Sequence, residues 1–126
     1  MGKGKTAVTQ RRNIVLCISD DPVRLNLRCS LLKQHGWEVL TASSGYEGVI
    51  LFSRSKADVV VVELNDGGAE AALITGELKR IRPEIPVVVL LGGSDPIPGA
   101  TDAADVVISS HNEQILVERL DALRAP

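Results

Sequence analysis

Three acidic residues stand at the ends of two aliphatic runs and are the first candidates for chemistry. Asp20 and Asp21 follow the run at 14–18, and Glu63 follows the run at 59–62. If both runs are parallel strands, their carboxyl ends meet at one edge, where carboxylate oxygens suit Mg²⁺ or Ca²⁺. In a second interpretation, Asp20 and Asp21 are turn and cap residues and Glu63 merely ends a strand. The residues alone leave both interpretations open.

The elements that would position these acids are short and strongly aliphatic. Four successive valines at 59–62 disfavour a helix and, because they lack polar alternation, indicate a strand buried on both faces. Similar runs follow at regular intervals along the chain. We predict strands at 14–18, 38–42, 58–63, 87–91 and 106–108.

Helical patterns separate these runs. Asp21 is placed to cap a helix that starts at Pro22 and ends at His35-Gly36. Its apolar stripe is predicted to consist of Val23, Leu27 and Leu31, with Gln34 at the end. A capping box at 44–47 opens a second helix that runs to about residue 54, and a third is predicted at about 69–82.

The last part of the chain has one weak and one strong helical pattern. Two prolines and three glycines within 92–99 cannot sustain a long helix, so the fourth helix should be shortened to about a turn at 100–104. Asn112 is the predicted cap of the final helix, in which Leu116, Leu120 and Leu123 repeat at helical spacing.

Strands that alternate with helices predict an open α/β fold. The expected architecture is a flavodoxin-like (βα)5 doubly wound, parallel, five-stranded sheet of order 2-1-3-4-5. Ligands of such sheets bind beyond the carboxyl ends of the strands, at the switch point between strands 1 and 3. Asp20, Asp21 and Glu63 are the residues expected there.

Composition bounds the domain organisation. The chain has 126 residues, of which 44% are hydrophobic and 24% charged, which fits one domain. The first twelve residues contain four basic residues and no acid, so we predict a flexible basic leader at 1–12 and a folded domain at 13–126.

No basic stripe with interleaved aromatics follows, which argues against direct nucleic-acid binding. No apolar run is long enough to cross a bilayer, and Cys17 and Cys29 show no paired spacing, so cytoplasm is the expected compartment.

Several segments together resemble a known family. The stretches at 14–22, 36–39, 42–47, 57–63 and 82–87 are similar to the receiver domain of bacterial two-component response regulators, in the CheY-like superfamily. The resemblance runs from about residue 13 to residue 123, and its strength lies in the order and spacing of the blocks. It implies the same fold that the strand and helix patterns predict.

The resemblance also implies roles for individual residues. Receiver domains catalyse their own phosphorylation, and Asp20 and Asp21 match the acidic pair that places Mg²⁺. Glu63 stands at the position of the phosphoacceptor Asp. Leu91 stands where the family has Ser or Thr, and Ser110, or Ser109 with a one-residue slip, where it has Lys. Val107 stands where it has an aromatic switch residue. The chain therefore resembles a degenerate receiver, a pseudo-receiver.

These replacements predict that conventional phosphorylation is absent or very slow. Glu63 carries its carboxylate one methylene farther out, Leu91 donates no hydrogen bond, and no Lys offsets the charge of the transition state. Asp66, in the following loop, is a less favoured acceptor. We expect no catalytic residues and no enzymatic function. Mg²⁺ should bind weakly at most, and the three acids without the Lys should repel each other and raise at least one carboxyl pKa.

The expected function is a receiver module of phosphorelay signalling that is phosphorylation-independent or weakly phosphorylated. Its expected partner is a protein, either a histidine kinase or an output or scaffold protein, and the sequence leaves the oligomeric state open. One alternative is a constitutively active receiver in which Glu63 imitates phospho-Asp. A flavodoxin-like ligand-binding protein or enzyme is less favoured, because no GxGxxG follows the first strand and aromatics are almost absent.

Overall fold

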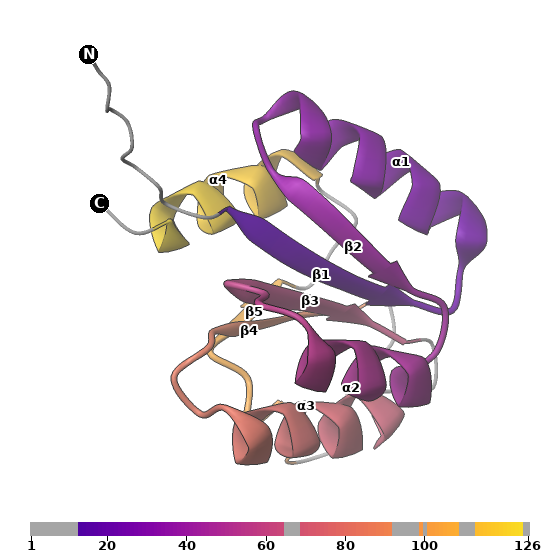
Figure 1. Ribbon diagram of the computed structural model, residues 1–126, viewed down its shortest axis with the longest axis vertical. Coiled ribbons are helices and arrows are strands. Elements are labelled where there is room, and N and C mark those ends of the chain that lie inside the picture. Colours follow the sequence, from indigo (N-terminus) through magenta and orange to yellow (C-terminus); the bar gives the residue numbers. More distant parts are fainter. Residues whose placement is uncertain (1–12, 65–68, 92–98, 100, 109–112, 125–126) are drawn as a thin grey trace.

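The computed structural model describes residues 13–64, 69–91, 99, 101–108 and 113–124 (Figure 1). Five parallel strands form one sheet of order β2-β1-β3-β4-β5, which confirms the predicted fold. The elements in chain order are β1 (Ile14–Ser19), α1 (Pro22–Gln34), β2 (Glu38–Ala42), α2 (Gly45–Arg54), β3 (Val59–Glu63), α3 (Ala69–Ile81), β4 (Val87–Leu90), β5 (Val106–Ile108) and α4 (Glu113–Leu123).

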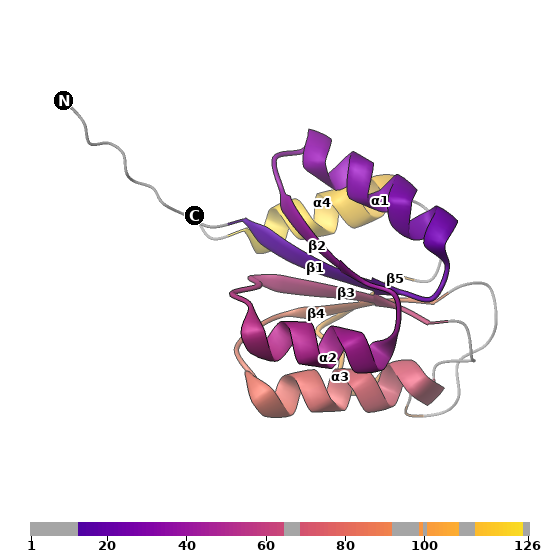
Figure 2. The same cartoon turned by 45° about the vertical axis from the view of Figure 1, so that its right-hand side comes forward.

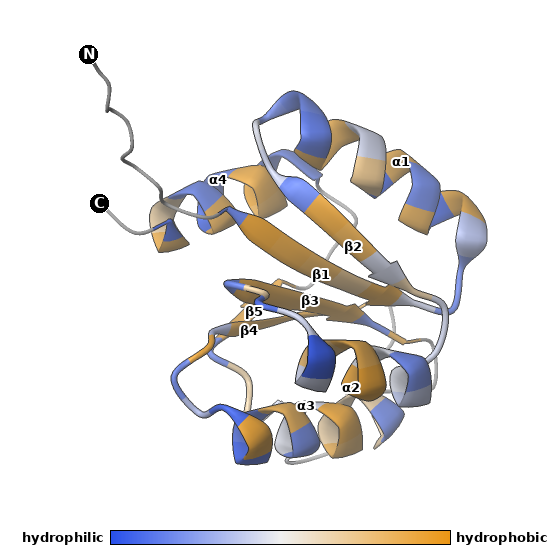
Figure 3. Cartoon of the chain, in the orientation of Figure 1, coloured by the Kyte–Doolittle hydropathy of each residue, from blue (hydrophilic) through white to orange (hydrophobic). Residues whose placement is uncertain are grey.

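The helices form a layer on each face of the sheet. Figure 2 shows α1 and α4 on one face and α2 and α3 on the other. Alternate residues of the central strands divide between the two layers, so Val61 packs with Leu32 and Leu120 on the first face, whereas Val62 packs with Phe52 on the second. The central strands are mostly apolar in Figure 3, whereas β2 and the helices include polar residues. Burial on both faces is the reason for the unbroken valine run.

The helix α1 begins as predicted but buries a different face. Asp21 caps it, because its Oδ1 accepts the backbone N–H groups of Val23 and Arg24, both at 3.1 Å. The predicted apolar stripe is wrong for Val23 and Leu27, which are each 67% exposed, whereas Leu31 is partly buried and packs against the core. The buried residues of α1 are Leu25, Arg28 and Leu32. An arginine inside the core is the physical reason for the shift, since its charge must reach partners beneath the helix.

The predicted capping box at α2 is present, with one change in its partners. Ser44 Oγ accepts the backbone N–H of Glu47 at 3.1 Å. The Glu47 carboxylate reaches back one residue farther than in the usual box, where it accepts the backbone N–H of Ser43 at 2.7 Å. This hydrogen bond lowers the pKa of Glu47.

The segment between β4 and β5 contains a turn at 101–103 and no α-helix among its described residues. The backbone N–H of Ala104 donates to the carbonyl of Thr101 at 3.1 Å, so the chain makes a single turn there before β5. The predicted leader at 1–12 and the predicted cap Asn112 lie outside the described residues. Within the described part of the chain, every helix is too short or too polar to span a membrane.

The glycine Gly48 allows α2 to approach β1 closely. A Cβ atom built on Gly48 would lie 2.4 Å from Cδ1 of the buried Ile18. Gly76 in α3 has no neighbour within 4 Å of the corresponding position. We expect Gly48→Ala to lower the free energy of unfolding by about 1–3 kcal/mol through overpacking. Gly76→Ala should raise it by about 0.5–1 kcal/mol through helix propensity. Urea denaturation checks both, and equal effects of the two substitutions would contradict the close approach.

Candidate functional site

The structure places the three predicted acids at the carboxyl edge of the sheet. Glu63 is the last residue of β3 and lies opposite Ser19, the last residue of β1, in the register of the two strands. Asp20 and Asp21 follow Ser19 directly, at the start of the connection to α1. This is the edge toward which the strand arrows point in Figure 2. It is the switch point between β1 and β3, where such sheets bind ligands.

Two arginines from α1 hold the carboxylate of Glu63. Arg24 Nη1 donates to Glu63 Oε2 at 2.8 Å, and Arg28 Nη1 donates to Glu63 Oε1 at 2.8 Å. The side chains of Glu63 and Arg28 are each only 1% exposed, whereas that of Arg24 is 35% exposed. Both carboxylate oxygens of Glu63 are therefore engaged by cations of the protein itself.

Arg28 extends this pairing to the last helix. Its Nε and Nη2 donate to the two carboxylate oxygens of Glu113, at 3.2 and 3.1 Å, in a two-pronged contact. Burial by itself would lower the pKa of Arg28, but the hydrogen bonds to Glu113 and Glu63 outweigh it and raise the pKa above its ordinary value. One guanidinium thus connects the end of β3 to the first residue of α4. We call Arg24, Arg28, Glu63 and Glu113 the arginine–glutamate network.

Asp21 and Asp20 have other surroundings. Asp21 Oδ1 caps α1, and its Oδ2 lies 3.6 Å from Arg24 Nε. Asp21 also binds Ser19, whose Oγ accepts the backbone N–H of Asp21 at 3.1 Å. Asp20 is exposed. The cap interpretation of Asp21, which the sequence left open, is confirmed.

The described residues do not fit a Mg²⁺ ion. No three His, Cys, Asp or Glu side chains in the described part of the chain form a group that could hold a metal. Both oxygens of Glu63 bind arginines, and Asp21 is used as a cap. The expected repulsion among uncompensated acids is wrong, because Arg24 and Arg28 supply the positive charge that the missing Lys would have carried.

The other predicted positions are only partly described. Leu91 follows β4, is half-buried and packs on the core beside α2 and α3. Val107 lies in β5 and is 40% exposed. Ser109, Ser110 and Asp66 lie outside the described residues. Leu91 therefore supplies no hydroxyl that could bind a phosphoryl group, and Val107 supplies no aromatic switch side chain.

Sequence reasoning missed Arg24 and Arg28. They are four residues apart, so they lie on one side of α1, in its first two turns next to the carboxyl edge. A signal for them exists: two arginines four residues apart, near the start of the helix that follows β1, are placed to pair with an acid at the same edge. The aliphatic pattern of α1 alone does not indicate that an arginine lies on its buried face.

Comparisons with known proteins agree with this fold. The transcriptional regulatory protein GlrR of Escherichia coli K12 is 34% identical over 83 residues, which is 65% of this chain and 19% of the relative. Protein PilH of Pseudomonas aeruginosa is 26% identical over 117 residues, which is 88% of this chain and 97% of the relative. The receiver domain protein of Clostridium thermocellum has a TM-score of 0.76 and 28% identity, covering 87% of this chain and 92% of that one. The chain resembles response regulator receiver domains in sequence and has their fold.

A further structural neighbour supports the fold. The response regulator TrrA of Thermotoga maritima, solved in complex with Mg²⁺-BeF, has a TM-score of 0.79 and 24% identity, covering 88% of this chain and 98% of its own. No protein-family model matches this receiver domain. The chain spans about a fifth of the length of GlrR.

Removal of Arg28 should destabilise the receiver domain strongly. We expect Arg28→Met to lower the free energy of unfolding by about 3–5 kcal/mol, because it leaves Glu63 with one half-exposed cation and takes the buried partner from Glu113. Arg80→Met is the matched control, since Arg80 pairs with Glu77 on the surface and should contribute no more than about 1 kcal/mol. Denaturant unfolding measures both. A loss at Arg28 no larger than at Arg80 would show that the network does not hold the fold.

Proposed function

We propose that this receiver domain works in two-component signalling as a protein-interaction module whose output does not depend on aspartyl phosphorylation. The observation that carries the proposal is the state of Glu63, which is 1% exposed and has an arginine on each carboxylate oxygen. A phosphoacceptor must instead present a free oxygen to the phosphodonor in line with the bond that breaks.

The energy of the arginine–glutamate network supports this proposal. Freeing Glu63 for phosphoryl transfer means breaking a buried ion pair, which costs about 3–5 kcal/mol. A barrier raised by even 3 kcal/mol slows a reaction by about two orders of magnitude. Leu91 adds to the effect because it offers no hydroxyl to the phosphoryl oxygens. These features favour a receiver that is phosphorylated very slowly or not at all.

The alternative of a constitutively active receiver has less support. In that alternative, the Glu63 carboxylate imitates the added negative charge of phospho-Asp. Arg24 and Arg28 neutralise this charge locally, and both come from α1. The link from Arg28 to Glu113 does fix the start of α4. It favours one permanent arrangement of that helix, which suits a module that is read in a single state.

A protein partner fits the exposed apolar side chains. Val23 and Leu27 lie one turn apart on α1, and each is 67% exposed. Exposed aliphatic neighbours of this kind are common contacts at protein interfaces. We infer that the partner is a histidine kinase or an output or scaffold protein, and that the module works in the cytoplasm without binding nucleic acid directly.

Incubation with acetyl phosphate and Mg²⁺ tests the proposal. We expect the intact mass to stay unchanged, because neither carboxylate of the network is free to be phosphorylated. The amide NMR spectrum and the Tm should also stay unchanged when millimolar Mg²⁺, with or without beryllofluoride, is added, since a ligand that does not bind the native state does not stabilise it.

A typical receiver domain treated in parallel serves as the positive control. A mass increase of about 80 Da assigned to Glu63 or Asp66 would overturn the proposal. A rise in Tm of several degrees with Mg²⁺ would show that the ion displaces the arginines, and phosphorylation would again have to be considered. Glu63→Asp is a useful companion variant, and we expect it to remain unphosphorylated because Arg24 and Arg28 are still present.

A further inference from the structure

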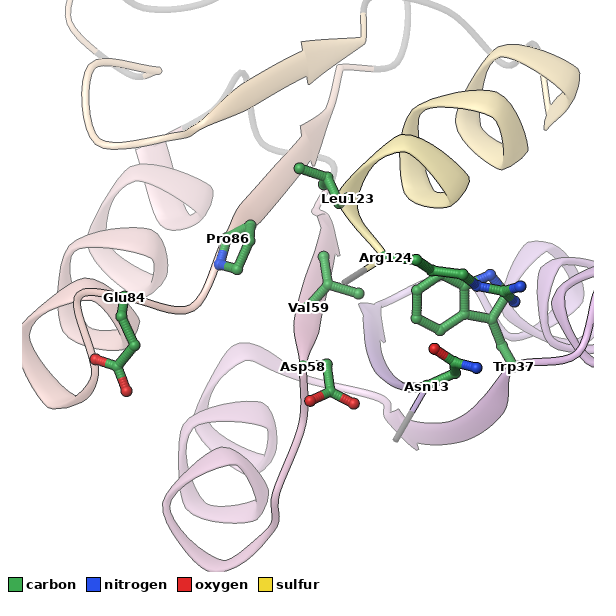
Figure 4. Close-up of a pocket in the computed structure, with 8 residues that line it drawn as sticks. All are labelled: Asn13, Trp37, Asp58, Val59, Glu84, Pro86, Leu123 and Arg124. Atoms are coloured by element: carbon green, nitrogen blue, oxygen red, sulfur yellow. The ribbon is translucent and has the colours of Figure 1, made fainter. Parts of the chain in front are cut away.

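A second concave site lies at the opposite end of the sheet from Glu63. It is a pocket of about 280 Å³ at the amino ends of β1, β3 and β4. Trp37, Val59, Pro86 and Leu123 line it with apolar surface, and Asp58 and Glu84 add carboxylates (Figure 4). The receiver chemistry discussed above uses none of these residues.

The positive charge within this pocket is already engaged. The Arg124 guanidinium lies over the Trp37 ring at 4.4 Å from its centre, and its Nη2 donates to the carbonyl of His35 at 2.6 Å. Its Nε also lies 3.8 Å from Asp121 Oδ1. Figure 4 shows Arg124 beside Trp37, while Asp58 lies below Val59 near Asn13 and Glu84 lies farthest from Trp37. Arg124 therefore does not neutralise those two acids.

The two carboxylates have capacity to spare. Asp58 uses Oδ2 to accept the backbone N–H of Ile14 at 2.8 Å. Neither Asp58 nor Glu84 forms an ion pair within the described part of the chain. An apolar wall next to unpaired carboxylates suits a cation on an aliphatic stem, because the stem covers the wall while the charged end meets the acids.

We propose that this pocket binds an arginine side chain of the chain's own basic leader, residues 1–12. Asn13 lines the pocket, and Arg12 and Arg11 precede it in the sequence in that order. The leader contains Lys3, Lys5, Arg11 and Arg12 and no acid, so its charge is opposite to that of Asp58 and Glu84. Because the leader is tethered to Asn13, its arginines are present at the pocket at an effective concentration on the order of millimolar. A free cation of the same chemistry at trace concentration competes poorly with them.

The leader thus binds at the end of the domain opposite the arginine–glutamate network. A bound leader arginine competes with other cations for Asp58 and Glu84. The proposal does not depend on whether Glu63 is phosphorylated, so the two can fail separately.

Trp37 makes the proposal directly testable, because it is the only tryptophan of the chain. We expect Arg11→Ser with Arg12→Ser to shift the indole N–H resonance and the fluorescence of Trp37. Lys3→Ser with Lys5→Ser removes the same charge farther from Asn13 and should leave both signals in place. Raising the salt concentration should move the intact chain toward the spectrum of the Arg11 and Arg12 variant, because ions screen the attraction.

The acids are tested by variants that keep the fold. Asp58→Asn retains an oxygen that can accept the Ile14 N–H, and Glu84 is exposed, so Glu84→Gln disturbs no core contact. Each should reproduce part of the spectral shift seen on removing Arg11 and Arg12. The proposal would be overturned if the Trp37 signals did not change on substitution of Arg11 and Arg12. An equal change on substitution of Lys3 and Lys5 would also overturn it.

A titration with N-acetyl-arginine amide distinguishes the leader from other sources of the cation. The Arg11 and Arg12 variant should bind this probe more tightly than the intact chain, because the leader no longer competes. Equal binding by both proteins would show that the leader is not the occupant, and lack of binding by the variant would show that the pocket does not take this cation.

Discussion

A carboxylate buried at the centre of the sheet edge constrains the rest of this site. Glu63 is 1% exposed, and an ionised carboxylate removed from water is tolerated only when cations and hydrogen bonds compensate for its lost hydration. Arg28 is the one buried cation among the described residues, and it meets this need together with the half-exposed Arg24. Because Arg28 must reach Glu63, α1 turns a charged side toward the sheet and leaves Val23 and Leu27 in solvent.

The same constraint explains how a receiver fold persists without the usual side chains of the family. The carboxyl edge, where Asp20, Asp21 and a phosphoacceptor are expected to place negative charge, is still acidic in this chain. In this chain the balancing charge comes from α1, through covalently attached guanidiniums. A guanidinium held by Glu63 and by both oxygens of Glu113 has little freedom to leave. The site has therefore become part of the structural core, which fits a module with one stable state.

The sequence predicted the fold far better than it predicted the site. Uninterrupted valines at 59–62 have one physical explanation, burial on both faces of a sheet, and the strand order follows from short right-handed crossovers. The face of α1 was mistaken because Leu27 and Leu25 are equally apolar, and only a long-range pair decides which of them is buried. Arg28 pairs with Glu63 on β3, which is 35 residues away in the sequence. The local periodicity of a helix cannot reveal a partner at that separation.

The two edges of the parallel sheet also differ in the charges that they favour. At the amino edge, the strands begin with backbone N–H groups, and carboxylates accept two of them: Asp58 binds the N–H of Ile14, and Asp105 binds that of Val87, each at 2.8 Å. Lys79 donates to Asp105, and hydrogen bonds from Lys79 and Val87 lower the pKa of Asp105 against the opposing effect of burial. At the carboxyl edge, by contrast, the strands end in carbonyl groups. Glu63, the last residue of β3, therefore needs arginines to balance its negative charge. Acids at the amino edge thus stabilise the start of the sheet, while an acid at the carboxyl edge must be balanced by a metal ion or a side-chain cation. In this chain Arg24 and Arg28 supply the side-chain cations that balance Glu63.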